Sequence, residues 1–332
     1  MDRGEVRMSV KKDLIEILEK NKGTSISGQQ LAECLSVSRT AVWKAIRSLQ
    51  EDGYKIEAVT NKGYCLKEES DILSEEGIRP KLIYACQNFP IFVYKSIDST
   101  NLEAKRKALE GAEEGTLILA EEQSQGRGRL GRGFASPSQT GIYMSLILKP
   151  SLEMKDAVLI TTAAAVAVCR AIQKITGMSP WIKWVNDIFL GERKICGILT
   201  EAVSDFETGL VESVVLGIGI NVKTKREQFP KEVQDVAGSL NVDSIISRNV
   251  LVAAVTNEFM YIYHNIEERE YMKDYRKFSN VLGEQVKYLE KGTWYYAKAV
   301  DIDDNGGLIV ENQAGERRTL CTGEITLRKV EK

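Results

Sequence analysis

Trp181-Ile-Lys-Trp-Val-Asn-Asp-Ile-Phe-Leu190 begins the stretch that decides the fold of the central part of this chain. After Gly191-Glu-Arg193 the stretch continues as Lys194-Ile-Cys-Gly-Ile-Leu-Thr-Glu201. Two apolar runs separated by a short turn predict a pair of strands. Polar side chains interrupt both runs, at Lys183, Asn186, Asp187 and Lys194. Buried polar groups need partners, so these residues either form internal salt bridges or line a ligand cleft.

Further strand-like runs flank this pair on both sides, and together they predict a sheet. They cover Ile91 to Tyr94, Thr116 to Ala120, Ile142 to Leu148 and Val214 to Asn221. The last run contains two glycines, and glycine weakens a strand unless another group must approach it closely.

A helix is expected from Leu102 to Leu109, directly after Ser96-Ile-Asp-Ser-Thr-Asn101. Ser99 or Thr100 can cap this helix. The free N–H groups of a helix start suit a polar or anionic ligand group, although a simple cap explains the same residues.

The segment Glu121 to Gly133 is a glycine loop that carries three arginines. Gly126, Gly128 and Gly131 formally match G-x-G-x-x-G, but no helix pattern follows, so the context does not fit a dinucleotide-binding motif. Arginine supplies paired donors for phosphate or carboxylate, and glycine lets the backbone approach a ligand. A basic surface loop or an RNA-binding patch remains the alternative. The three arginines are Arg127, Arg129 and Arg132.

The first 68 residues predict a winged helix-turn-helix. A capping box at Ser27 and Gln30 starts one short helix, and Ser38 can cap a second one after the turn at residues 36–38. Two runs, Tyr54 to Val59 and Tyr64 to Leu66, flank the turn at residues 60–63 and predict a hairpin, the wing.

The outer face of the second helix and the wing tip carry the residues expected to contact DNA. Val42, Ala45, Ile46 and Leu49 repeat at helical spacing and should face inward. The alternative is a protein-interaction module with a solvated basic face, but a large exposed aromatic usually contacts something. The candidate DNA-binding residues are Arg39, Thr40, Trp43, Lys44, Arg47 and Lys62.

Composition excludes several classes of protein. The 332 residues indicate two or three domains, and the net charge of −2 means that any DNA-binding surface must be local. A single histidine, His264, leaves little room for a histidine zinc site or a Ser-His-Asp triad. The six cysteines are scattered without a Cys-x-x-Cys pair, so we expect reduced, buried thiols.

The chain carries no signal for export or membrane insertion. Its most apolar stretch, Ala157 to Cys169, is too short to span a bilayer and is expected to be a buried helix. The N-terminus lacks an apolar signal-peptide core. We therefore expect a cytoplasmic protein with no membrane partner.

The C-terminal part, from about Tyr275 onward, changes to short strands divided by turns at Asp304-Asn-Gly-Gly307 and Ala314-Gly315. This pattern predicts a small β-barrel, and no residue in it points to chemistry of its own.

The order of five motifs resembles the bifunctional biotin–protein ligases, and the winged helix matches the repressor subgroup of that family. The motifs are Ser-Thr-Asn101, Gly126-Arg-Gly-Arg-Leu-Gly-Arg132, Lys183-Trp-Val-Asn-Asp187, Lys194-Ile-Cys-Gly-Ile-Leu-Thr-Glu201 and Gly217-Ile-Gly-Ile-Asn221. Single motifs of this kind are weak, but five in order behind a winged helix are highly specific.

The resemblance implies an α+β fold with three domains and a linker. The expected domains are a winged helix-turn-helix at residues 1–68, a linker at 69–80, a mixed-sheet catalytic domain like the class II synthetases at 81–274, and an SH3-like barrel at 275–332.

The implied reaction forms biotinyl-5′-AMP from biotin and ATP and then transfers biotin to a lysine of a carboxylase carrier domain. By similarity, Lys194, Arg129 and Asp187 are catalytic, and Asp187 binds Mg²⁺. The biotin contacts implied are Ser99, Thr100, Asn101, Gln123, Arg127, Gly128, Arg129 and Lys194, and the nucleotide contacts are Arg127, Phe134, Lys183, Asn186 and Asn221.

No residue is expected to act as a covalent nucleophile, which agrees with the scarcity of histidine. Two positions depart from other members of the family: Phe134 stands where some have Trp, and Val185 where some have Pro. An aromatic ring for adenine survives at the first position. Val185 is expected to be tolerated because a strand accepts valine readily.

The implied partners are the biotin carboxyl carrier domain of acyl-CoA carboxylases, a palindromic operator DNA and a second copy of the chain, with the homodimer formed when the adenylate is bound. The competing interpretations are a lipoate–protein ligase, a non-catalytic biotin sensor and a dinucleotide-dependent enzyme.

Overall fold

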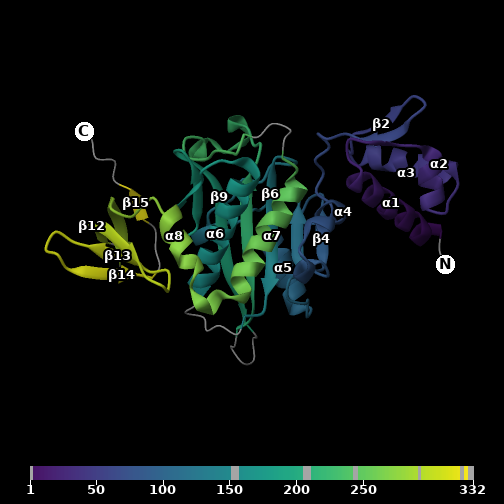
Figure 1. Ribbon diagram of the computed structural model, residues 1–332. Coiled ribbons are helices and arrows are strands. Elements are labelled where there is room, and N and C mark those ends of the chain that lie inside the picture. Colours follow the sequence, from purple (N-terminus) through teal and green to yellow (C-terminus); the bar gives the residue numbers. More distant parts are fainter. Residues whose placement is uncertain are drawn as a thin grey trace. The chain divides into compact units, whose positions relative to one another are not determined.

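The computed structural model describes residues 3–150, 157–204, 211–241, 246–290, 293–321 and 325–327. The chain forms two compact units. Unit 1 comprises Met1–Leu82 with Val242–Ala253, and unit 2 comprises Ile83–Asn241 with Ala254–Lys332. Figure 1 labels their elements.

Unit 1 contains the predicted winged helix-turn-helix. Its helices are α1 (Arg3–Lys20), α2 (Gly28–Cys34) and α3 (Arg39–Glu51), and its strands β1 (Ser25–Ile26), β3 (Gly63–Leu66) and β2 (Ile56–Val59) pair in the order β1-β3-β2.

The local signals in unit 1 fold as predicted. Ser27 and Gln30 form the capping box of α2, and the Ser38 hydroxyl accepts a hydrogen bond from the Ala41 N–H at the start of α3. The four apolar residues of α3 are buried against Leu14 and Leu18 of α1 in one core.

The segment expected to be a linker, residues 69–80, carries more structure than its polar composition indicated. It contains α4 (Glu75–Ile78) and the start of a 3₁₀ turn, Arg79–Lys81. The fully buried Arg248, at the start of α7 (Arg248–His264), pairs with Asp71 at 3.0 Å. Because these two residues are 177 positions apart, no local pattern could reveal the contact.

Unit 2 is built on a seven-stranded mixed sheet, as predicted. Its strands run in the order β4-β5-β6-β10-β9-β8-β7, with β4 and β5 parallel and all other neighbours antiparallel. Their bounds are β4 Ile91–Tyr94, β5 Leu117–Ala120, β6 Gly141–Leu148, β7 Trp181–Lys183, β8 Asp187–Leu190, β9 Arg193–Ser204 and β10 Val211–Asn221.

Helices pack on this sheet, and α6, α7 and α8 lie in front of it in Figure 1. α5 (Thr100–Leu109) packs on β6 and β10, while α6 (Ala157–Thr176) packs on β7, β8 and β9. α6 is long and apolar enough to cross a membrane, but 67% of its apolar window is buried inside the protein. It is therefore a core helix, as the sequence predicted.

One strand prediction is wrong. Residues 181–190 do not form a single strand, because β7 ends at Lys183, the chain turns at residues 184–186, and β8 pairs back on β7. Val185 thus lies in a turn and not in a strand. Tertiary contacts hold this turn: the Tyr275 hydroxyl donates to the Val185 carbonyl at 3.0 Å, and the Trp184 indole donates to the Gly306 carbonyl at 2.9 Å.

The C-terminal part of unit 2 is a small antiparallel β domain. The strands pair in the order β14-β13-β12-β11-β15. The domain begins later than predicted, because α8 (Tyr271–Phe278) extends past residue 275. The strands are β11 Gln285–Glu290, β12 Thr293–Ile302, β13 Leu308–Glu311, β14 Arg317–Leu320 and β15 Ile325–Leu327.

All six cysteines are free thiols, and the prediction that they are buried holds for four of them. Cys34 and Cys321 are exposed instead. Burial raises the pKa of Cys86 to about 11, which keeps this thiol protonated and unreactive at neutral pH.

Candidate active site and candidate nucleic-acid interface

A single cavity of about 470 Å³ in unit 2 brings together every candidate ligand-contact and catalytic residue of the central segment. These residues come from the start of α5, the glycine loop, β7, β8, β9 and the end of β10. The candidates that line the cavity are Ser99, Thr100, Asn101, Gln123, Arg127, Gly128, Arg129, Phe134, Lys183, Asn186, Asp187, Lys194 and Asn221.

An ion pair between Lys194 and Asp187 lies at one wall of the cavity. The Lys194 ammonium is 2.7 Å from Asp187 Oδ1, and both side chains keep about a quarter to a third of their surface exposed. The Lys194 backbone is fixed by hydrogen bonds to Val236 and Gly238, at 2.8 Å each. The sequence left open whether these polar residues form an internal salt bridge or line a ligand cleft. The Lys194–Asp187 pair does both, because it is an internal salt bridge that also faces a cavity.

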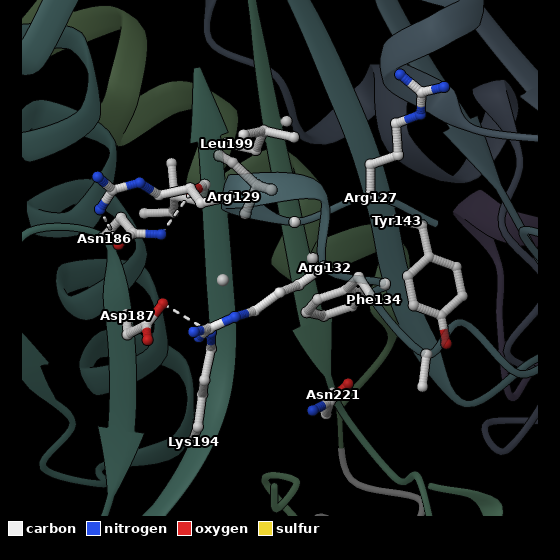
Figure 2. Close-up of a pocket in the computed structure, with 18 of the residues that line it drawn as sticks. Arg127, Arg129, Arg132, Phe134, Tyr143, Asn186, Asp187, Lys194, Leu199 and Asn221 are labelled. Carbon is white, nitrogen blue, oxygen red and sulfur yellow. Dashed lines mark hydrogen bonds and ion pairs between the residues drawn. The ribbon is translucent and has the colours of Figure 1, made fainter. Parts of the chain in front are cut away.

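The turn at residues 184–186 anchors the glycine loop. Arg129 Nη1 donates to Asn186 Oδ1 at 3.0 Å, and Asn186 Nδ2 donates to the Ile198 carbonyl at 2.8 Å (Figure 2). Since Tyr275 of α8 and Gly306 of the C-terminal β domain hold this turn, they also support the position of Arg129.

The glycine loop folds back on itself, and this fold adds an arginine that the site prediction omitted. Gly128 N donates to the Arg132 carbonyl at 2.7 Å, and Phe134 N donates to the Gly126 carbonyl at 2.8 Å. Arg132 also lines the cavity, and Figure 2 shows its side chain extending across it, whereas the Arg127 side chain points away. Only the turn inside the loop decides which arginine faces inward, so the sequence motif could not distinguish them.

Polar side chains at the start of α5 form the floor of the cavity. The Thr100 N–H donates to Gln123 Oε1 at 2.8 Å, the Thr100 hydroxyl lies 3.1 Å from the same oxygen, and Gln123 Nε2 donates to the Ser136 hydroxyl at 2.8 Å. Ser99 occupies the cap position of α5, but its side chain makes no cap hydrogen bond. The Ser99 hydroxyl is thus not used for capping, which departs from the expected role.

The two glycines of β10 make room for side chains of the cavity wall. A Cβ atom on Gly219 would lie 2.5 Å from the Phe134 ring, and one on Gly217 would lie 2.1 Å from Asn101 Oδ1. The predicted close approach is therefore real, but the approaching groups are protein side chains.

Asn221, at the end of β10, carries an unsatisfied oxygen. Its Nδ2 donates to the Gly238 carbonyl at 2.9 Å, while its buried Oδ1 has no hydrogen-bond partner among the residues the structure describes. An unpaired buried acceptor at a cavity wall is suited to a ligand donor.

Apolar residues complete the cavity, and the sequence did not single them out. Their only signal is hydrophobicity, which does not distinguish a cavity wall from a core. They are Tyr143, Met144, Trp184, Phe189, Ile198, Leu199, Ile218, Phe229, Val233 and Val236.

The donor set for a metal is small. Asp187 is the one carboxylate among the residues found to line the cavity, and no group of three acidic, histidine or cysteine side chains suited to a metal occurs in the described ranges. The described residues alone therefore offer no closed metal site. A single carboxylate does fit Mg²⁺ that arrives with phosphates, because this ion usually takes only one or two protein carboxylates.

The candidate nucleic-acid interface lies on the exposed face of α3, opposite its buried residues. The indole of Trp43 is 52% exposed, and the Arg47 guanidinium carbon is 5.8 Å from its ring centroid. The other candidates are also exposed: Arg39, Thr40 and Lys44 on α3, and Lys62 at the wing tip.

Three family matches cover most of the chain. Residues 10–65 match the HTH domain, residues 93–221 match the Biotin/lipoate A/B protein ligase family, and residues 281–328 match the Biotin protein ligase C terminal domain.

Similar proteins match most of the chain. The chain is 36% identical to the bifunctional ligase/repressor BirA of Bacillus spizizenii over 94% of this chain and 97% of that protein. It is 30% identical to the biotin–[acetyl-CoA-carboxylase] ligase of Mycobacterium tuberculosis, over 76% and 95% of the two chains. The solved structure of the Aquifex aeolicus biotin protein ligase in complex with biotin and ATP matches with a TM-score of 0.61 and 27% identity, covering 73% of this chain and 99% of that one.

Proposed function

The chain belongs to the family of bifunctional biotin ligase/repressors, and from this membership we propose how it acts: it makes biotinyl-5′-AMP from biotin and ATP, transfers biotin to a carrier lysine, and represses transcription in response to biotin. The observation that carries the enzymatic part is the one cavity in which an ion-paired lysine, two inward arginines and a neutral polar floor meet.

The first step joins two anions, so the cavity has to neutralise charge. A carboxylate oxygen of biotin attacks the α-phosphorus of ATP, a new O–P bond forms, and the bond to the β-phosphate oxygen breaks to release pyrophosphate. Lys194, Arg129 and Arg132 are the cationic groups proposed to hold the two reactants and the developing charge. Each of them lines the cavity.

Asp187 keeps Lys194 ready for this task. Its carboxylate, at 2.7 Å, holds the ammonium at the cavity wall. An entering carboxylate or phosphate would then share this ammonium with Asp187. Asp187 is also the residue proposed to contact Mg²⁺ bound to ATP, an ion that would screen the phosphate charges.

The two ends of the cavity suit the two substrates. The neutral polar floor of Ser99, Thr100 and Gln123 fits the uncharged ureido ring of biotin. Phe134 offers a ring for adenine, and Asn186, Asn221 and Lys183 are the further proposed nucleotide contacts. In the second step a carrier lysine attacks the anhydride carbonyl and AMP leaves, so the enzyme needs no nucleophile of its own.

The proposed partners are a biotin carboxyl carrier domain of an acyl-CoA carboxylase and a palindromic operator DNA bound by a homodimer that forms with the adenylate. Support comes from the acetyl-CoA-carboxylase specificity in the name of one relative and from the exposed basic face of α3. A DNA partner and the use of ATP favour the cytoplasm, with no membrane partner.

The experiment that tests the enzymatic proposal is biotin-dependent exchange of pyrophosphate into ATP by the full chain. We expect exchange with biotin and none with lipoate. Exchange with lipoate and not with biotin would indicate a lipoate–protein ligase instead. Biotin binding without exchange would favour a non-catalytic sensor.

Gly219→Ala is expected to weaken ATP use selectively. The added methyl would lie 2.5 Å from the Phe134 ring and displace it from the proposed adenine site. We expect KM for ATP to rise about fivefold, since the loss of an aromatic ring contact costs about 1 kcal/mol.

Biotin affinity measured by calorimetry should stay close to that of the parent chain. Gly28→Ala in unit 1 is the matched control, because its new methyl meets only the edge of Tyr64 at 3.4 Å. An unchanged KM for ATP in Gly219→Ala would remove Phe134 from the adenine site.

A further inference from the structure

Asn101 is held so completely by the protein that it has little left to offer a ligand. Its side chain is nearly buried, with 4% exposed. Asn101 Oδ1 accepts from the Ser145 hydroxyl at 2.6 Å, and Nδ2 donates to Glu201 Oε2 at 2.8 Å and faces the Leu199 carbonyl at 3.4 Å. An amide has one acceptor oxygen and two donor hydrogens, and all of these are engaged.

Glu201 on β9 receives two donors at once. Its Oε2 accepts from Asn101, and its Oε1 accepts from Lys105 Nζ at 2.6 Å. Lys105 lies one helical turn after Asn101 on α5, so both donors project from the same face of the helix. Burial raises the pKa of Glu201, but the hydrogen bonds from Lys105 and Asn101 outweigh it and hold this pKa below its ordinary value. Glu201 is therefore a carboxylate at neutral pH, with an acceptor for each donor.

Ser145 on β6 extends this arrangement to the floor of the cavity. Its hydroxyl lies 2.6 Å from Asn101 Oδ1 and 2.8 Å from Thr100 Oγ1, and it is fully buried. Thr100 in turn binds Gln123. Ser145 and Thr100 each have one hydroxyl hydrogen, and these two serve the contact with Asn101 Oδ1 and the contact between the two hydroxyls. A hydrogen-bonded chain therefore runs from Glu201 through Asn101 and Ser145 to Thr100, whose N–H holds Gln123.

Gly217 on β10 closes the remaining side of Asn101. The amide oxygen occupies the place where a Cβ atom on Gly217 would be, at 2.1 Å. The amide can neither rotate freely nor withdraw, so its orientation is set before any ligand arrives.

We propose that Glu201 and Lys105 are positioning residues for the biotin end of the cavity, and that they act through Asn101 and Ser145 to fix the hydrogen-bonding directions of Thr100 and Gln123. Asn101 then links α5, β6 and β9 through hydrogen bonds and does not contact biotin directly. This inference rests on the proposed function, because it takes Thr100 and Gln123 as biotin contacts.

The test begins with Glu201→Gln, which keeps the size of the side chain. Glutamine has one acceptor oxygen, whereas Lys105 and Asn101 are both donors, so one donor must face the new amide N–H₂. We expect the Kd and KM for biotin to rise about tenfold, while kcat at saturating biotin and KM for ATP change less than about twofold.

The double variant Glu201→Gln/Lys105→Met separates positioning from general damage. Methionine keeps the length of the lysine stem and removes its ammonium, which lets the glutamine oxygen turn to Asn101. We expect biotin affinity to recover to within about threefold of the parent chain. Asp274→Asn, which weakens an ion pair with Arg170 in the same unit whose side chains are about one third exposed, is the matched control and should leave biotin affinity unchanged.

Each outcome has a distinct meaning. Parent-like biotin affinity in Glu201→Gln overturns the positioning role, and so does a double variant that binds no better than the single one. Equal losses for biotin and ATP, with a lowered melting temperature, indicate a purely structural role and also overturn it. Failure of the proposed function is seen in the parent chain alone, as an absence of biotin-dependent exchange.

Discussion

Lys194→Ala is expected to lower biotin-dependent pyrophosphate exchange about a thousandfold, because the loss of one preorganised charge at a reacting centre costs two to three orders of magnitude. The substitution removes the ammonium and leaves the Asp187 carboxylate, 24% exposed, at the wall of a cavity that must hold two anions. Exchange activity should therefore fall for two reasons: the cation is lost, and the Asp187 anion is left unpaired. Single-turnover formation of biotinyl-5′-AMP measures this effect directly.

The control for this variant is Lys174→Ala. Lys174 also belongs to unit 2, but its side chain is 75% exposed and its contact with Glu258 is long, at 3.8 Å. It should retain parent exchange activity and melting temperature. Exchange by Lys194→Ala within about tenfold of the parent chain, with the fold intact, would exclude Lys194 as the main charge-stabilising group.

Local patterns predicted much of the fold because the responsible forces act over short stretches. The capping box at Ser27, the buried stripe of α3 and the apolar strands of the central sheet depend on neighbours in sequence. Long-range contacts were invisible for the same reason. Asp71 meets Arg248 across 177 positions, and the turn at residues 184–186 is held by Tyr275 and Gly306, far along the chain.

The candidate site was predictable as a set of residue types and much less as a geometry. The motifs identified the polar residues that line the cavity, but three details needed the structure. Arg132 and not Arg127 extends across the cavity. Gly219 makes room for the Phe134 ring, and Asn101 is hydrogen-bonded to Glu201 and Ser145. Each detail depends on how a loop or an adjacent strand returns to the site, which one-dimensional spacing does not encode.

The Trp43→Ala/Arg47→Ala double variant is expected to bind its operator about a hundredfold more weakly, because each specific contact in a major groove contributes about 1–3 kcal/mol. Both side chains lie on the exposed face of α3, and the ring of Trp43 is close enough to hold the Arg47 guanidinium in place. The two single variants should therefore be less than additive, since loss of Trp43 also frees Arg47.

The operator is first selected from a random duplex library by the full chain with biotin and ATP, and affinities are then measured by fluorescence anisotropy across a range of salt. Lys20→Ala is the matched control: Lys20 is an exposed lysine on α1 that pairs with Glu16 and lies outside the proposed interface.

Lys62→Ala should weaken binding to all duplexes alike and reduce the salt dependence of binding by about one phosphate contact. Biotin-dependent exchange should be unchanged in all five variants, because the cavity lies in unit 2 and these residues lie in unit 1. If the double variant binds the selected duplex as tightly as Lys20→Ala does, the exposed face of α3 is not the reading surface, and the repressor part of the proposal would have to rest on another element of unit 1.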